Sequence, residues 1–184
     1  MNVDALIKGI KQLESRAPSG EIAYLSLNGK SENHIRDLIS FNVAQNKPSW
    51  NIQREQNQID LVLTNTRGSR LSIEFKMGYA GGVINQRETS QVISSALKDI
   101  EKRGHEIINC IGIMDFSSDE DIDLRSYRNP SVIKRTIHDD NALRKAKSII
   151  AEVWKDSKCR FTNVNCGVWR GVSVTIMFCT IQHA

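Results

Sequence analysis

The sequence predicts one α/β domain in which helices flank a mixed β-sheet. Three observations support this fold class. First, an apolar segment at residues 58–63 and an alternating strand at residues 70–76 are joined by a polar linker rich in Asn, Gly and Ser, as in a β-hairpin. Second, a helical pattern at residues 86–103 separates that strand from an apolar run at residues 107–114, and this order implies a parallel crossover. Third, two strands around Arg170-Gly171 predict a C-terminal hairpin.

The first third of the chain predicts two helices and a strand. Apolar residues recur at helical spacing from Val3 to Leu13. Ser31 suits the N-cap of a second helix, which ends before Pro48. The first turn of this helix carries Glu32, for which the helix macrodipole already gives a plain structural explanation. Residues 50–54 then predict a strand that leads into the apolar segment.

The remainder of the chain predicts loops, one more helix and the terminal strands. Residues 77–82 are rich in glycine but lack phosphate-loop spacing, so they predict a flexible passage beside a site. Residues 115–123 are acidic and predict a solvated loop, and residues 139–158 show the apolar stripe of a packing helix. The strands of the hairpin are expected at residues 160–169 and 172–182.

Composition narrows the class of protein. A chain of 184 residues with 40% hydrophobic and 25% charged residues is typical of one globular domain. No apolar run approaches the roughly 18 residues that span a bilayer, and the N-terminus lacks the pattern of a signal peptide, so we expect a cytoplasmic protein without membrane association. The four cysteines lack metal-site spacing and predict reduced thiols. A net charge of +4 is compatible with a polyanionic partner.

The hairpin carries the most informative side chains. Glu74 and Lys76 lie two residues apart on one strand and therefore point to the same side, and the neighbouring strand brings Asp60 close to them. Acids beside a cationic group suit a hard divalent cation. The alternative is an exposed Glu74–Lys76 ion pair, which would contribute roughly 0–1 kcal/mol. The short pattern alone is weak, because Asp156 and Lys158 repeat it at a helix end.

The order of elements strengthens the first interpretation. Residues 31 to 114 contain five elements in order: a helix bearing Glu32, a strand with Asp60, the strand Glu74-Phe75-Lys76, a helix and a buried strand. This arrangement resembles the PD-(D/E)XK nuclease superfamily, which has the restriction-endonuclease-like fold. Ile59 stands where the family name has Pro, a position that varies widely among members.

The resemblance implies a set of site residues and a cofactor. It implies Mg²⁺ or Mn²⁺ held by Asp60, Glu74, the Phe75 backbone carbonyl and Glu32, with Lys76 orienting or deprotonating the attacking water. Family members often use a further polar residue on the following helix. That role falls to Gln91 or Gln86 in this chain.

Three functions follow from these residues. The first is a metal-dependent endonuclease that hydrolyses DNA, as a homodimer if it cuts both strands of a duplex. The second is a toxin-like ribonuclease of the same fold, and the third is a non-catalytic nucleic-acid-binding subunit, which would be expected to lose an acid or the lysine. Basic residues that could contact phosphates under any of these functions are Lys98, Lys102, Arg125, Arg128, Lys134, Arg135, Arg144 and Lys147.

Overall fold

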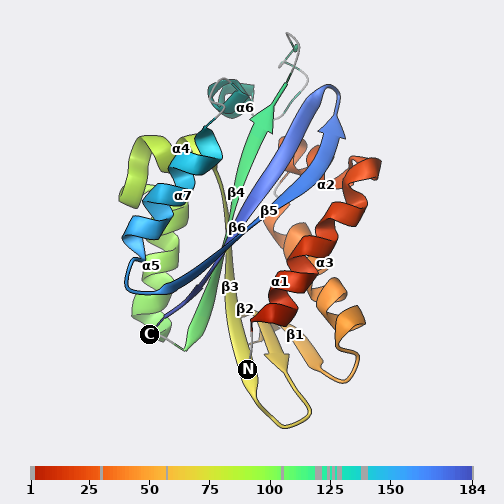
Figure 1. Cartoon of the computed structure of the whole chain (residues 1–184), viewed down its shortest axis with the longest axis vertical. Helices are drawn as coiled ribbons and strands as arrows, with labels where there is room; N and C mark the ends of the chain where they lie inside the picture. The colour runs from red at the N-terminus through yellow and green to blue at the C-terminus, as the bar shows by residue number, and fades with distance from the viewer. Residues whose placement is uncertain are drawn as a thin grey trace.

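The protein folds as a mixed β-sheet with helices on both faces, as seen in a computed structural model (Figure 1). The structure describes residues 3–29, 31–56, 58–104, 106–118, 122–123, 125, 127, 130–137 and 141–183, without the side chains of residues 130, 132, 135 and 136. Within this part of the chain no helix is both long and apolar enough to cross a membrane.

Among the described residues the sheet has six strands, in the order β1-β2-β3-β4-β6-β5. Neighbouring strands pair antiparallel except β3 and β4, which are parallel, as the predicted crossover requires. The strands are β1 (Asn51–Gln56), β2 (Ile59–Thr64), β3 (Arg70–Tyr79), β4 (Ile107–Ser117), β5 (Lys158–Trp169) and β6 (Val172–Gln182).

The helices divide between the two faces of the sheet (Figure 1). One face is covered by α1 (Asp4–Lys11), α2 (Glu21–Asn28) and α3 (Ser31–Asn46), and the other by α4 (Ala80–Gln86), α5 (Gln91–Arg103) and α7 (Ala142–Val153). Helix α6 (Pro130–Ile137) contacts β4, and 3₁₀ segments cover Gln12–Ser19 and Arg87–Thr89. Alternate residues of the central strands enter the two cores. Phe75 faces the α1–α3 side, whereas Ile111 and Ile113 face the α4, α5 and α7 side.

Several predictions from the sequence are confirmed. The hairpin of β2 and β3, the strand β4, the helix that begins at Ser31 and the C-terminal hairpin of β5 and β6 lie within a few residues of the predicted positions. All four cysteines are free thiols.

The prediction of a flexible glycine-rich loop at residues 77–82 is wrong. Strand β3 continues to Tyr79, and α4 begins at the next residue. Gly78 serves close packing rather than flexibility, because an added Cβ there would lie 3.0 Å from the Cβ of Val92 on α5. The predicted helix at residues 86–103 is also interrupted. Arg87 follows the last residue of α4 with φ at 46°, a non-helical conformation that separates α4 from α5.

Three short helices were not predicted, and one predicted helix is shorter. α4 has seven residues and α2 and α6 have eight each, too few for a periodicity to stand out. The helix expected at residues 139–158 is α7, Ala142–Val153, and residues 138–140 lie outside the described part. Of the loop expected at residues 115–123, residues 115–117 extend β4.

Candidate active site

The candidate site lies where β2 leaves β3. The last residue pair between these strands is Leu61–Ile73, whereas β3 remains paired with β4 as far as Tyr79. Beyond Ile73, therefore, β2 no longer covers that edge of β3. The backbone N–H of Phe75 donates to Asp60 Oδ2 at 2.8 Å, and the N–H of Met77 donates to Glu32 Oε2 at 2.8 Å. Two carboxylates thus take the place of the missing strand.

Glu74 and Lys76 lie on the face of β3 that α5 covers. Extending the register by one pair places Asp60 opposite Glu74. Glu74 is buried, with 3% of its surface exposed, and its Oε1 lies 3.2 Å from Arg103 Nε on α5. The ammonium of Lys76 lies 2.9 Å from Asp99 Oδ2, also on α5, and 3.8 Å from Glu74 Oε2. The exposed ion pair considered from the sequence is therefore not what the structure has.

Arg36 connects α3 to the same cluster. It lies one helical turn after Glu32, is 5% exposed, and donates to Asp60 Oδ1 at 3.0 Å and to Glu55 Oε1 at 3.1 Å. Sequence reasoning missed Arg36, Arg103 and Asp99. The spacing of Glu32 and Arg36 by four residues was the one available signal that Arg36 shares a helix face with a site residue.

Two carboxyl groups of the site, Glu74 and Glu32, have raised pKa values. Burial raises the pKa of Glu74 to about 7, helped by a hydrogen bond to Asp60 and by the charge of Asp60, against the opposing effect of Arg103 and Lys76. Burial also raises the pKa of Glu32, although the Met77 N–H and Lys76 work against this. Part of the Glu74 population is therefore protonated at neutral pH.

Lys76 is held in its charged form. Burial works against its charge, but the hydrogen bond to Asp99 and the charges of Asp99, Asp60 and Glu74 outweigh burial, so that its pKa lies above the ordinary value. In this arrangement Lys76 acts as a cation. It does not have the free amine that a general base requires.

A polar group on the next strand also borders the site. Asn109 of β4 is the register partner of Glu74 and is fully buried. Its Oδ1 lies 2.8 Å from His183 Nε2, and His183 Nδ1 lies 3.3 Å from Ser157 Oγ. Asn109 Nδ2 has no hydrogen-bond partner among the described residues. This connection to the C-terminus was not foreseen from the sequence.

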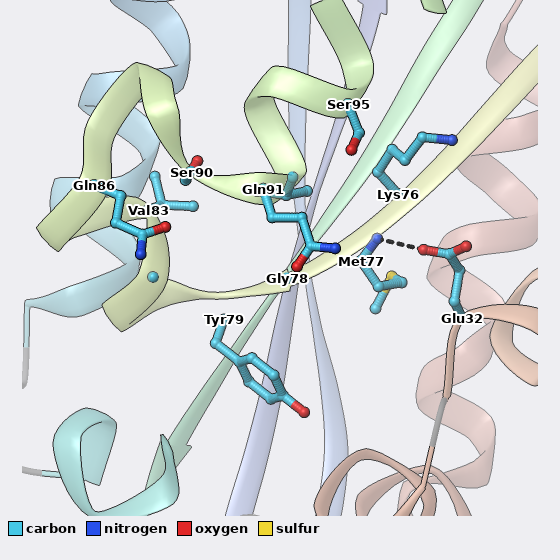
Figure 2. Close-up of a pocket in the computed structure, with 12 residues that line it drawn as sticks. Glu32, Lys76, Met77, Gly78, Tyr79, Val83, Gln86, Ser90, Gln91 and Ser95 are labelled. Atoms are coloured by element: carbon cyan, nitrogen blue, oxygen red, sulfur yellow. Dashed lines mark hydrogen bonds between the residues drawn. The ribbon is translucent and has the colours of Figure 1, made fainter. Parts of the chain in front are cut away.

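A cavity of about 400 Å³ adjoins the cluster (Figure 2). Glu32 and Lys76 border it, and Figure 2 shows the Glu32 carboxylate at the Met77 N–H. Both predicted auxiliary residues line this cavity, Gln86 from α4 and Gln91 from the start of α5. The structure thus gathers Glu32, Asp60, Glu74 and Lys76 in one place, with Gln86 and Gln91 beside them.

The oxygen atoms of the cluster are of the type that a hard divalent cation binds, but in this structure they have other partners. Asp60 and Glu74 face each other, and the Phe75 carbonyl lies on the same strand edge as the Phe75 N–H that bonds Asp60. Among the described residues, however, no group of three or more His, Cys, Asp or Glu side chains is placed to hold a metal ion. Arg36 and two backbone N–H groups take the oxygens that a metal would need.

The predicted phosphate-contacting residues are scattered. Lys98 and Lys102 are exposed on α5, Lys134 on α6, and Arg144 and Lys147 on α7. Arg125 is exposed and bonds to Asp123. Arg128 and the side chain of Arg135 lie outside the described part of the structure.

Comparisons of the chain with protein-family models, with curated proteins and with solved structures gave no match.

Proposed function

We propose that this protein is a metal-dependent nuclease with a restriction-endonuclease-like core, and that DNA is its substrate. The observation that carries the proposal is the pair of facing carboxylates, the buried Glu74 and the half-buried Asp60, beside the ammonium of Lys76. Two carboxylates that share a buried position hold a proton or a cation between them. A domain stabilised only by packing has no reason to keep them there, because burying acids costs free energy.

The roles of the side chains follow from their surroundings. Asp60, Glu74, the Phe75 carbonyl and Glu32 are the groups that would hold Mg²⁺ or Mn²⁺. When bound, such an ion supplies an activated water and neutralises charge on the scissile phosphate. Glu32 and Asp60 are fixed by backbone N–H groups of β3, which limits their movement.

Lys76 contributes positive charge rather than basicity. Because its pKa is raised, it stays protonated and can attract the phosphate and orient the attacking water. Arg36 and Arg103 balance the carboxylates while no other cation is present. A bound cation would replace Arg36 as the partner of Asp60 and Arg103 as the partner of Glu74.

One observation favours a catalytic protein over a non-catalytic subunit. All four predicted side chains, Glu32, Asp60, Glu74 and Lys76, are present and lie together. The ribonuclease alternative uses the same residues, so the geometry does not separate it from a deoxyribonuclease. A comparison of DNA and RNA as substrates does.

The test is cleavage of plasmid DNA, branched DNA and structured RNA with Mg²⁺, Mn²⁺ or EDTA, comparing wild type with Glu74→Gln and Lys76→Ala. We expect metal-dependent cutting of DNA that each substitution lowers about a hundredfold or more. Cutting of RNA alone would establish the ribonuclease. If wild type cuts nothing but binds nucleic acid as both variants do, the nuclease proposal is wrong.

A further inference from the structure

The cavity beside the candidate site has the size of a small-molecule pocket. Its volume of about 400 Å³ falls within the roughly 300–1,000 Å³ typical of such pockets. It is bordered by the end of β3, by α4 and by the start of α5 (Figure 2). A base-paired duplex cannot enter a space of this size, whereas one nucleobase with its sugar can.

The lining favours an uncharged group with both hydrogen-bond donors and acceptors. Among the described residues that border the cavity, Glu32 and Lys76 are the only charged ones, and both belong to the candidate site. The remaining polar side chains are the amides of Gln86 and Gln91 and the hydroxyls of Tyr79, Ser90 and Ser95. Amides carry a donor and an acceptor each, as the edge of a base does.

Ser90 gives a more specific indication. It is 2% exposed, borders the cavity, and its Oγ has no hydrogen-bond partner among the described residues. Buried hydroxyls are normally satisfied, and this one stands immediately before the first turn of α5 without capping that helix. A polar group of a ligand in the cavity would satisfy it.

We propose that this cavity receives an unpaired nucleoside of the substrate strand, next to the phosphate held at Lys76. The inference rests on the proposed nuclease function. Because the cavity and the carboxylate cluster share Glu32 and Lys76, a strand whose phosphate lies at Lys76 places its neighbouring nucleoside at the cavity mouth. The base must be unstacked to enter, so the substrate is single-stranded at this point or becomes so on binding.

Gly82 allows the cavity to be filled without disturbing the fold. It borders the cavity, and a Cβ added there meets nothing within 4 Å. Leu is also a better helix former than Gly, so Gly82→Leu is expected to keep α4 intact. Asn85→Leu is the matched control, since Asn85 is exposed on the same helix and does not border the cavity.

The experiment measures binding in EDTA, so that it does not depend on cleavage. Labelled 12-nucleotide single strands of DNA and RNA, the paired duplexes, and single strands built of abasic residues are titrated by fluorescence anisotropy. Abasic strands keep every phosphate, so the electrostatic contribution is the same. We expect wild type and Asn85→Leu to bind base-bearing strands roughly tenfold or more tightly than abasic or paired ones. Gly82→Leu should abolish that preference.

Equal binding of base-bearing and abasic strands by wild type would overturn the proposal, as would a preference that survives in Gly82→Leu. Cleavage assays with Mg²⁺ run in parallel separate the two conclusions. If wild type cuts DNA but shows no preference for base-bearing strands, the nucleoside pocket is wrong and the nuclease proposal stands. If wild type shows the preference but cuts nothing, the pocket is supported and the nuclease proposal is wrong.

Discussion

Replacing Glu74 with Gln should stabilise the protein at alkaline pH. Glu74 is buried and its pKa is raised to about 7 from an ordinary value of 4.5. At about 1.4 kcal/mol per pH unit, this difference corresponds to about 3 kcal/mol. The neutral carboxyl is the form that the fold favours. The stability that Glu74 contributes is therefore complete below pH 4.5 and is lost as the pH rises through 7.

Gln keeps the shape of Glu74 and carries no charge at any pH. At pH 8 in EDTA we expect Glu74→Gln to unfold at a higher temperature than wild type by roughly 6–12 °C, using about 2–4 °C per kcal/mol for a chain of this size. At pH 4.5 the two proteins should unfold at nearly the same temperature. Thermal unfolding followed by circular dichroism at both pH values measures the difference.

The control is Glu101→Gln, which changes an exposed acid on α5, the helix that carries Asp99 and Arg103. It should have little effect at either pH. The reasoning is refuted if Glu74→Gln unfolds at or below the wild-type temperature at pH 8, or if its offset is the same at pH 4.5.

Three further outcomes are expected. If Mg²⁺ binds at Glu74, it must displace the proton of this carboxyl, so the affinity of the protein for Mg²⁺ should rise between pH 6 and 8. Calorimetry in buffers of different ionisation enthalpy should detect the released protons, and an affinity that does not depend on pH would contradict this expectation. Lys76→Arg should retain more of the cleavage rate than Lys76→Ala, because Lys76 acts as a cation, and the titration of Lys76 should not change the wild-type rate between pH 8 and 9.5. A rise in rate with an apparent pKa in that window, lost in Lys76→Arg, would assign Lys76 a base role. Arg36→Ala should lower the unfolding free energy by about 3 kcal/mol in chemical denaturation, since it leaves Asp60 without its buried partner. Lys134→Ala, which changes an exposed side chain on α6, should have little effect, and equal effects of the two substitutions would show that the Arg36 network is not structural.

The sequence was sufficient where the pattern is local. Alternation along β3 and the hairpin linker predicted antiparallel strands with Asp60 close to Glu74, and the strand–helix–strand order predicted the parallel pairing with β4. It misled at Gly78, because a glycine that permits close packing and a glycine that permits bending look alike in a sequence.

Contacts over long separations were beyond sequence reasoning. Arg36 reaches Asp60 and Arg103 reaches Glu74 because α3 and α5 cross the strands at particular angles, which no short pattern encodes. Glu32 was assigned to the site through the family resemblance, and its bond to the Met77 N–H places it there by geometry. The functional assignment itself stays a prediction.

The uncovered edge of β3 bears on how such a chain can diverge. Asp60 and Glu32 each satisfy a backbone N–H that no strand reaches, so a substitution at either position would still have to supply an acceptor oxygen. Asn and Gln supply one. Among the described residues, the partners of the Glu74 and Lys76 side chains are other side chains only, so the backbone of β3 would not oppose substitution at these two positions.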